Sequence, residues 1–302
     1  MAGRASNRND PSVAGQTRCA AAAAAPTCGG PSLTKPVTSL PTGPHANLAP
    51  FTVVAQRSLP VFGAPATLVF VPARRERRDA AGPDRPAFRP SRAQTIVAEE
   101  QIWRGDGLVL TPNRFPFARE QRILWPDRPL RDPDEPMWAA ANEWADAAVG
   151  AVLVNTVGAA ATIGRAHAHL LPERSPFLSA LRQRPASPAL QRLIELPAGA
   201  ELIVADVPFC LLGLRGPAAA RAAALVRLGE ARLCPSWNVV VQDGVAWVYP
   251  RRLETPAPHF PFALGAAELW GRWCYVDEGP FTAATTRDLE QALVLAGVEP
   301  LP

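Results

Sequence analysis

One segment governs how the rest of the sequence is interpreted: Asn155-Thr-Val-Gly158-Ala-Ala-Ala-Thr162-Ile-Gly164-Arg165-Ala-His167-Ala-His169-Leu-Leu-Pro172. It holds two of the four histidines of the chain, placed two positions apart among small apolar residues. Side chains alternate between the two faces of a β-strand, so a strand over 165–171 puts Arg165, His167 and His169 on one face. The intervening apolar residues then form the packing face. The segment therefore predicts a strand with chemistry on one side and core on the other.

Two imidazoles beside a cation can bind a metal, relay protons or attack an electrophile directly. A metal usually needs a third ligand, and the nearest carboxylate, Glu173, lies beyond Pro172, which ends the predicted strand. Direct attack needs a neutral imidazole in one tautomer, with donors for the charge that develops on a phosphoryl or acyl oxygen. Arg165 and Arg174 can supply such donors. The alternative is a set of polar residues on a half-exposed strand.

The segment from Arg165 to Pro172 resembles the His-x-His-x-His-x-x-Pro strand of the histidine-triad superfamily. It is also similar to the His-x-His-x-Gln strand of the branch that contains galactose-1-phosphate uridylyltransferases and diadenosine tetraphosphate phosphorylases. The resemblance implies that His167 attacks a nucleotide α-phosphate and carries a covalent nucleotidyl intermediate. It implies that His169 steadies a nonbridging oxygen. Arg165 stands where the family has its first histidine, a departure that bears on the orientation of His167 and on the leaving group.

Two earlier segments resemble the same branch. Phe70-Val-Pro72-Ala-Arg74 is similar to a Phe-Asn-Pro-Ala-Arg segment of bacterial phosphorylase-like members, which implies a phosphate contact for Arg74; the alternative is a solvated basic loop. Asn113-Arg-Phe115-Pro joins two predicted strands, 108–112 and 122–126, and resembles a nucleotide-pocket element. Asn113 can form a hydrogen bond with a ribose or a base edge, and Phe115 or Phe117 can stack on a base. The alternative is a turn asparagine and two core phenylalanines.

The loop before the histidines and a later hairpin add further candidates. Asn155 corresponds approximately to a family asparagine, and the small residues around Gly158 and Thr162 let the backbone approach a phosphate closely. Strands on either side of Asp243-Gly244 predict a tight hairpin. This hairpin, which contains Asn238 and ends at Arg251, resembles the carboxy-terminal part of dinucleoside polyphosphate and GDP-sugar phosphorylases. The resemblance implies nucleotide or phosphate contacts from Asn238 and Arg251.

Composition limits the class of protein. The chain has 302 residues, 48% of them hydrophobic, which is enough for a sizeable core in one large or two smaller domains. A formal net charge of +4 with scattered arginines suits a small polyanionic substrate and argues against a nucleic-acid platform. The five cysteines have irregular spacings that do not suggest a disulfide framework. This favours a location in a reducing compartment, the cytoplasm. No segment is apolar enough to span a membrane.

A structural zinc site and other cofactors are not expected. Arg85-Pro-Ala87-Phe-Arg-Pro90 resembles the Arg-Pro-Cys-Phe-x-Cys-Pro element that holds zinc in relatives, but Ala87 and Pro90 occupy the two thiolate positions and cannot ligate a metal. The chemistry requires no resident metal, although Mg²⁺ carried by the substrate is compatible with it.

The sequence as a whole predicts an α+β, histidine-triad-like fold of two pseudo-duplicated halves, each with antiparallel strands flanked by helices. Residues 1–48 are predicted to be disordered, 49–200 to form the catalytic half and 201–302 the carboxy-terminal half. Helices are expected over 134–148, 217–233 and 286–297, and strands over 51–71, broken at Pro60 and Gly63.

The predicted function is nucleotidyl transfer, as a phosphorylase or a uridylyl- or adenylyltransferase, on a nucleoside diphosphate sugar or dinucleoside polyphosphate. The acceptor is phosphate or a sugar phosphate, and the protein is expected to be a monomer or homodimer. Two alternatives remain open. One is a hydrolase of an unusual nucleotide conjugate, favoured by a histidine rather than a glutamine at position 169. The other is a nucleotide-binding module without catalysis.

Overall fold

A computed structural model of the chain describes residues 48–75, 90–148, 150–231 and 234–301. Residues 1–47 of the segment expected to be disordered therefore lie outside the described residues. Ala87, at one of the two thiolate positions of the zinc element, also lies outside them. The strands are β1 (Ala55–Val61), β2 (Ala64–Phe70), β3 (Trp103–Gly105), β4 (Leu108–Pro112), β5 (Arg122–Pro126), β6 (Ala151–Asn155), β7 (Ala168–Leu171), β8 (Gln183–Pro185), β9 (Glu201–Ala205), β10 (Leu212–Arg215), β11 (Ser236–Gln242), β12 (Val245–Arg251) and β13 (Arg272–Tyr275). The helices are η1 (Pro72–Arg74), α2 (Pro90–Glu99), α3 (Glu135–Ala147), α4 (Phe177–Ala180), α5 (Pro188–Ile194), α6 (Ala218–Ala231), α7 (Ala266–Leu269), α8 (Glu278–Ala283) and α9 (Thr286–Ala296).

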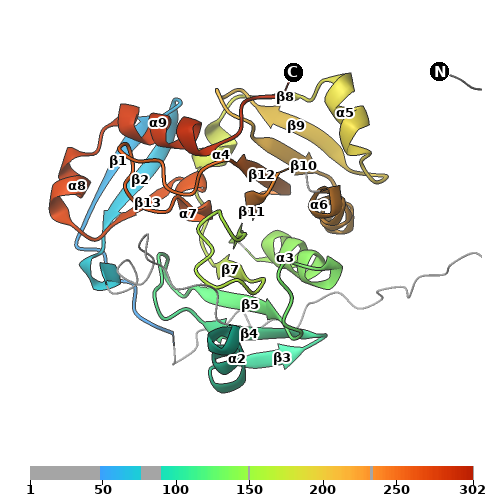
Figure 1. The fold of residues 1–302 in the computed structure, drawn as a ribbon, viewed down its shortest axis with the longest axis horizontal. Coiled ribbons are helices and arrows are strands. Elements are labelled where there is room, and N and C mark those ends of the chain that lie inside the picture. Colours follow the sequence, from blue (N-terminus) through green and yellow to red (C-terminus); the bar gives the residue numbers. More distant parts are fainter. Residues whose placement is uncertain (1–47, 76–89, 149, 232–233, 302) are drawn as a thin grey trace, which may run out of the picture. The chain divides into compact units, whose positions relative to one another are not determined.

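Ten of the strands form one antiparallel sheet, in the order β3-β4-β5-β7-β6-β11-β12-β10-β9-β8 (Figure 1). Read from each edge to the centre, the two halves have the same topology, because β3-β4-β5-β7-β6 matches β8-β9-β10-β12-β11. The helix also falls at the same point in both halves, with α3 between the third and fourth strands of one and α6 between those of the other. The predicted α+β, pseudo-duplicated fold is confirmed. The second repeat begins at β8, before the boundary expected at residue 201.

The two repeats differ in the connection that precedes the last strand. Residues 156–167 link β6 to β7 in the first repeat, whereas Asp243 and Gly244 alone link β11 to β12 in the second. Both turn residues have positive φ, 54° and 72°, as a two-residue hairpin requires. The predicted hairpin is confirmed, and the long loop, which contains His167, belongs to the first repeat alone.

A separate three-stranded sheet joins the two ends of the described chain. β1 and β2 form an antiparallel hairpin, and β13 pairs with β2 in parallel. The predicted break at Pro60 is wrong, because Pro60 lies inside β1. β1 is an edge strand, so the missing N–H of a proline is tolerated there. The predicted break at Gly63 is confirmed, because the chain turns at Phe62 and Gly63, which both have positive φ.

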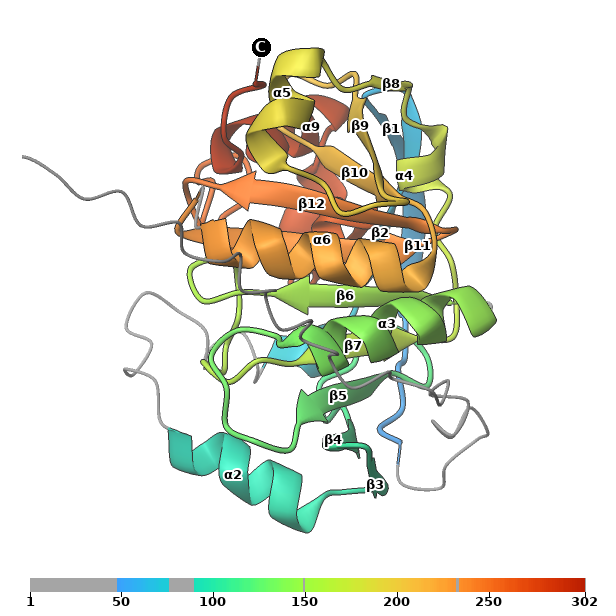
Figure 2. The ribbon, with the colours of Figure 1, turned by 90° about the vertical axis from the view of Figure 1, so that its right-hand side faces the viewer.

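The two faces of the large sheet have different covers. Helices α3 and α6 pack together on one face (Figure 2), where Ala168 and Leu170 of β7 join the core they form with the strands. The three-stranded sheet and helices α7 and α9 contribute to the core on the opposite face, and α2 packs beside β4 and β5 in a smaller cluster. His169 is paired with Ile123 of that smaller cluster and with Leu153 of the larger one. The apolar side chains of β7 thus pack in the core beneath α3 and α6, whereas His169 lies between the other two clusters.

Several local predictions are confirmed. The carboxylate of Asp134 accepts a hydrogen bond from the backbone N–H of Met137 and caps α3, with Pro136 in the first turn. Helices α6 and α9 and the β4–β5 hairpin lie within a few residues of their expected positions. None of the helices in the described ranges combines the length and apolar character that a membrane crossing requires.

The strand that carries the histidines is shorter than predicted. β7 begins at Ala168, so Arg165 and His167 lie in the segment before it. The physical reason is found at Pro126, which has no N–H and whose carbonyl oxygen accepts a hydrogen bond from the guanidinium of Arg165 at 2.5 Å. The side chain of Arg165 thus occupies the position in which a longer β7 would pair with β5. The predicted packing side is nevertheless confirmed, since Ala166 lies in the same core as Ala168 and Leu170.

Candidate active site

A cavity of about 440 Å³ lies where α2, β4, β5 and the histidine segment meet. Its size suits a small organic ligand. Six of the residues predicted from the sequence line it, namely Asn113, Phe115, Phe117, Thr162, His167 and His169. The remaining lining residues are Thr95, Ile96, Glu99, Glu100, Pro112, Arg114, Ile123, Trp125 and Ile163.

The imidazole of His167 is held in one tautomer. Its Nδ1 lies 2.8 Å from the backbone oxygen of Arg165. A carbonyl oxygen can only accept a hydrogen bond, so Nδ1 carries the proton and the lone pair of the neutral ring is on Nε2. The ring also stacks on the indole of Trp125, with centroids 4.9 Å apart and an interplanar angle of 31°. His167 is 4% exposed, so few side-chain orientations are open to it.

His169 is held on a different side. Its Nδ1 is 2.9 Å from Nε2 of Gln121, and its ring meets Phe117 edge to face at 5.4 Å. The His167 and His169 rings lie 5.2 Å apart and nearly perpendicular. The two histidines therefore line one cavity with their Nδ1 atoms engaged by two separate partners, a main-chain carbonyl and a side-chain amide.

The turn at Asn113 shapes the wall of the cavity next to β4. The side-chain oxygen of Asn113 accepts a hydrogen bond from the backbone N–H of Phe115 at 3.0 Å, an arrangement typical of an Asx turn. This turn brings Phe115 and Phe117 to the cavity, and Phe117 is 5% exposed. Asn113 thus acts as a turn residue, which is one of the two alternatives drawn from the sequence, and it also lines the cavity.

Arg165 does not line the cavity. Its guanidinium donates to the backbone oxygens of Pro126 and Asp127 at 2.5 and 2.9 Å, and the residue is 5% exposed. Burial lowers the pKa of this guanidinium, while the nearby charge of Asp127 acts in the opposite direction. The expected position at a substrate phosphate is therefore corrected: the side chain fixes the end of β5, and the backbone oxygen orients His167.

Three other predicted residues form a buried link between the repeats. Arg251, which is 0% exposed, donates to the side-chain oxygen of Asn238 at 2.5 Å and to the backbone oxygen of Leu264 at 2.6 Å. Asn238 donates to Asn155, whose side-chain oxygen also accepts from the N–H of Ala266. Burial lowers the pKa of Arg251. Arg251, Asn238 and Asn155 therefore stabilise the junction of β6, β11 and α7, and not one of them lines the cavity.

The last three predicted residues, Arg74, Arg174 and Gly158, do not line the cavity. Arg74 sits over the ring of Phe117, 5.6 Å from its centroid, so it touches a cavity residue without lining the cavity. Arg174 forms an ion pair with Asp243 at 3.0 Å. Gly158, with φ of 86°, lies next to Ser236 at the start of β11. The structure thus separates Arg74, Arg174 and Gly158 from the histidine pair.

Sequence reasoning missed the wall that α2 contributes. Glu99 and Glu100 line the cavity, and Glu100 pairs with Arg114 at 2.8 Å. The sequence signal was present: Ala93 and Val97, four residues apart, face the core of the smaller cluster as helical spacing predicts. Trp125 was also missed, although strand alternation puts it on the same face as Ile123. Among the described residues, no group of three or more His, Cys, Asp or Glu is arranged to hold a metal ion.

Comparisons with known proteins give a likeness of fold. No family model matches the sequence, and no curated protein matches it. The structure is similar to that of yeast Ap4A phosphorylase Apa2 in complex with Ap4A, with a TM-score of 0.57, 17% identity and coverage of 83% of this chain and 93% of that one. The same yeast protein in complex with AMP gives a TM-score of 0.54 at 16% identity, covering 83% and 91%. At this identity the comparison shows a shared fold, and the predicted likeness of fold to diadenosine tetraphosphate phosphorylases is confirmed.

Proposed function

We propose that the protein is a nucleotidyltransferase that acts on a nucleoside diphosphate sugar or a dinucleoside polyphosphate through a nucleotidyl-His167 intermediate. The observation that carries the proposal is the tautomer of His167. Because the Arg165 carbonyl holds the proton on Nδ1, Nε2 has the lone pair that a nucleophile needs. The fold shared with a yeast Ap4A phosphorylase supports the same class of reaction.

The reaction proceeds in two displacements. Nε2 of His167 forms a bond to the α-phosphorus, and the bond from that phosphorus to the leaving phosphate oxygen breaks with its electron pair on the leaving group. An acceptor oxygen then attacks the phosphorus, and the electron pair of the N–P bond returns to Nε2. The proton of the acceptor passes to solvent. His169 steadies a nonbridging oxygen through a hydrogen bond from its ring N–H.

The cavity walls suit the nucleoside part of such a substrate. Phe115 and Phe117 offer aromatic surface for a base, and Thr95, Glu99 and Glu100 offer oxygens to hydroxyl groups of a ribose. Glu100 is already paired with Arg114, which leaves Glu99 as the better acceptor candidate. The substrate would place a small neutral or hydroxylated moiety against this wall and its reacting phosphate at the histidines. Such a pose accounts for both the aromatic and the acidic residues that line the cavity.

Orthophosphate as the acceptor makes the enzyme a phosphorylase, and a sugar phosphate makes it a transferase. We test this with nucleoside diphosphate sugars and diadenosine tetraphosphate, each incubated with and without orthophosphate or a sugar phosphate. The proposal expects nucleotide products that depend on the acceptor and disappear in His167→Gln. His259→Gln is the matched control, because His259 is paired with Asp288 outside the cavity. Products formed equally without any acceptor but water indicate a hydrolase.

A nucleotide-binding module without catalysis is the second candidate, and the observation that favours it is the position of Arg165. The family has a histidine at this place, and here its replacement turns its side chain to Pro126 and Asp127. A module of this kind binds nucleotides with equal affinity in the native protein and in His167→Gln, and yields no product with any acceptor. Calorimetric titration of both proteins beside the product assay separates the two functions.

A further inference from the structure

We propose that Gln121 sets the tautomer of His169, and that the Glu173–Arg272 ion pair, outside the cavity, helps to hold Gln121 in place through the backbone of Phe117. The consequence for turnover rests on the proposed function, whereas the tautomer itself is a property of the resting protein. Gln121, Glu173 and Arg272 are then positioning residues for His169.

The orientation of the Gln121 amide follows from its two partners. Its Oε1 accepts a hydrogen bond from the backbone N–H of Phe117 at 2.8 Å. The other end of the amide, Nε2, is therefore the atom 2.9 Å from Nδ1 of His169. An amide nitrogen can only donate, so Nδ1 of His169 accepts and the neutral ring carries its proton on Nε2. Gln121 is 2% exposed, which leaves little room for water to replace either bond.

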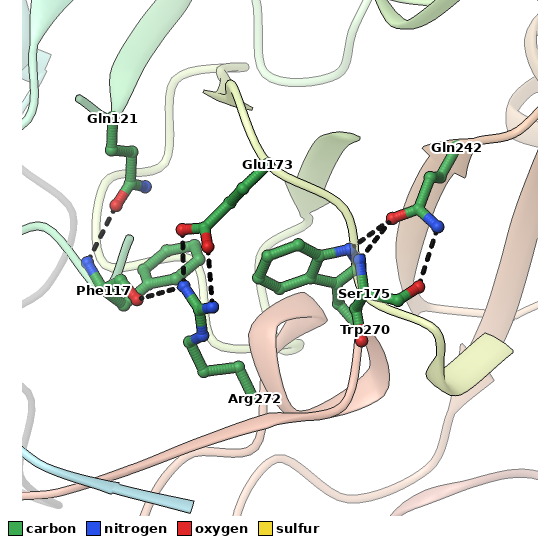
Figure 3. A network of polar contacts seen from close by, with 7 residues as sticks. All are labelled: Phe117, Gln121, Glu173, Ser175, Gln242, Trp270 and Arg272. Atoms are coloured by element: carbon green, nitrogen blue, oxygen red, sulfur yellow. Dashed lines mark hydrogen bonds and ion pairs between the residues drawn. The ribbon is translucent and has the colours of Figure 1, made fainter. Parts of the chain in front are cut away.

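The backbone of Phe117 is held through two adjacent peptide groups, one that contains its N–H and one that contains its carbonyl oxygen (Figure 3). Its N–H donates to Gln121, and its carbonyl oxygen accepts a hydrogen bond from Nη1 of Arg272 at 3.2 Å. Arg272 belongs to β13, far from Phe117 in the sequence, and its guanidinium lies 4.8 Å from the Trp270 ring centroid. The bond from Arg272 holds the peptide group that follows the Cα of Phe117. It therefore limits movement of this Cα and of the neighbouring N–H that binds Gln121, so Arg272 acts on the amide orientation indirectly.

Glu173 connects the same arginine to the histidine strand. Both of its carboxylate oxygens accept from Arg272, at 2.6 and 2.9 Å, and a paired geometry of this kind restricts both side chains. Only Pro172 separates Glu173 from the end of β7. Two residues after Glu173, the backbone of Ser175 forms two hydrogen bonds with the side-chain amide of Gln242. The N–H of Ser175 donates to Oε1 at 3.0 Å, and its carbonyl oxygen accepts from Nε2 at 2.9 Å. The segment after β7 is therefore held at two points, and one of them reaches Gln121.

The two histidines consequently have opposite tautomers. His167 carries its proton on Nδ1, and His169 carries its proton on Nε2, in rings whose centroids are 5.2 Å apart. At Nε2, His167 therefore has a lone pair, whereas His169 has a proton. A neutral His169 in this tautomer donates a hydrogen bond from Nε2 without the second proton of an imidazolium.

The first test is ¹⁵N NMR of the histidine rings in the protein without substrate. The chain has only four histidines, so His169→Asn and His167→Asn assign the two signals. Above the pKa, we expect the Nδ1–H pattern for His167 and the Nε2–H pattern for His169. An Nδ1–H pattern for His169 overturns the proposal. This result is independent of any substrate, so failure of the proposed function cannot be mistaken for it.

The second test is Gln121→Glu, which has nearly the same shape. A carboxylate still accepts from Phe117 N–H, but its other oxygen accepts from Nδ1 of His169 and raises the pKa of that ring. The imidazolium form retains an Nε2–H below the raised pKa. Above it, the carboxylate holds the remaining proton on Nδ1 and the donor at Nε2 is lost. We expect kcat to fall at high pH in this variant alone, with the Nδ1–H pattern in the NMR spectrum.

Gln191→Glu is the matched control for this change, because Gln191 is exposed on α5 and does not line the cavity. It should leave the pH profile of kcat and the His169 signal as in the native protein. A Gln121→Glu variant with the native profile and an Nε2–H ring at high pH contradicts the proposed role of Gln121.

The third test separates the ion pair from general stability. Arg272→Lys keeps a positive charge but loses the paired bonds to Glu173 and the bond to Phe117. We expect a mixture of His169 tautomers and a kcat lowered by roughly tenfold, typical when a partner that orients an active-site histidine is lost. Arg182→Lys is the control, since its ion pair with Asp206 is long, at 3.7 Å, and 86% and 54% exposed. Native His169 signals and native kcat in Arg272→Lys overturn the part of the proposal that concerns the ion pair.

Discussion

The backbone oxygen of Arg165 lies 2.8 Å from Nδ1 of His167, so Arg165 orients the His167 ring through its main chain. Its side chain meanwhile holds the end of β5 through Pro126 and Asp127. The main-chain contact is available to any residue at this position. The identity of residue 165 should therefore affect folding stability more directly than it affects the tautomer of His167.

Replacing Arg165 by methionine tests this division. The variant removes two buried hydrogen bonds to carbonyl oxygens, and we expect the free energy of unfolding to fall by roughly 1–3 kcal/mol. The NMR signal of His167 should keep its Nδ1–H pattern. Denaturant titration and ¹⁵N NMR measure the two quantities. Unchanged stability together with an altered His167 tautomer would contradict the account.

The stacking partner of His167 depends on one further hydrogen bond. Nε1 of Trp125 donates to the hydroxyl of Thr111 at 2.9 Å, and both residues are 0% exposed. Thr111→Val leaves the indole N–H buried without an acceptor, so we expect a loss of roughly 1–3 kcal/mol in unfolding free energy. Thr67→Val, in the half-buried part of β2, is the matched strand control and should change stability much less. Equal losses in both variants would count against this hydrogen bond.

Arg251 is predicted to stabilise the fold and not to bind a phosphate. It is fully buried, and Arg251→Met removes the donor to the side-chain oxygen of Asn238 and to the carbonyl oxygens of Leu264 and Leu253. We expect the unfolding free energy to fall by roughly 3–5 kcal/mol, typical when one member of a buried charged network is removed. Arg252→Met, at the exposed neighbouring position, should be close to native. A stable Arg251→Met protein with a selectively raised KM would instead return Arg251 to the substrate site.

The buried thiol of Cys210 gives stability a pH dependence. Burial raises its pKa from 9.0 to about 11. Above pH 9 the unfolded chain releases this proton while the folded chain still holds it, so the contribution is present below pH 9 and is lost as pH rises towards 11. In Cys210→Ala, the decline in unfolding free energy over this interval should be smaller than in the native protein. Parallel pH curves for the two proteins would contradict the shift.

Local features of the fold were predictable because local chemistry determines them. Asp134 before Pro136 indicates a helix start, and Asp243-Gly244 between apolar runs indicates a two-residue hairpin. Alternation also predicts the packing side of β7. Each of these signals lies within a few residues of the feature that it specifies, and the structure bears each of them out.

Contacts between distant segments were not predictable in this way. Nothing near Thr67 indicates that β2 pairs with Arg272 of β13, and nothing near Gln121 indicates that its amide meets His169. Charge alone also misled the assignment of Arg165 and Arg251, because an arginine that binds phosphate and one that holds buried carbonyl oxygens look the same in a sequence. Burial distinguishes them, and burial is decided by the tertiary structure.

The most direct test of the covalent mechanism is the intact mass of the protein after brief incubation with nucleoside diphosphate sugars and diadenosine tetraphosphate, without an acceptor. His167→Gln and His259→Gln serve as the nucleophile variant and the histidine control. The account predicts an adduct of nucleoside monophosphate mass on the native protein and on His259→Gln, and none on His167→Gln. Nucleotide binding by the native protein without any adduct, or an adduct that persists in His167→Gln, would contradict it.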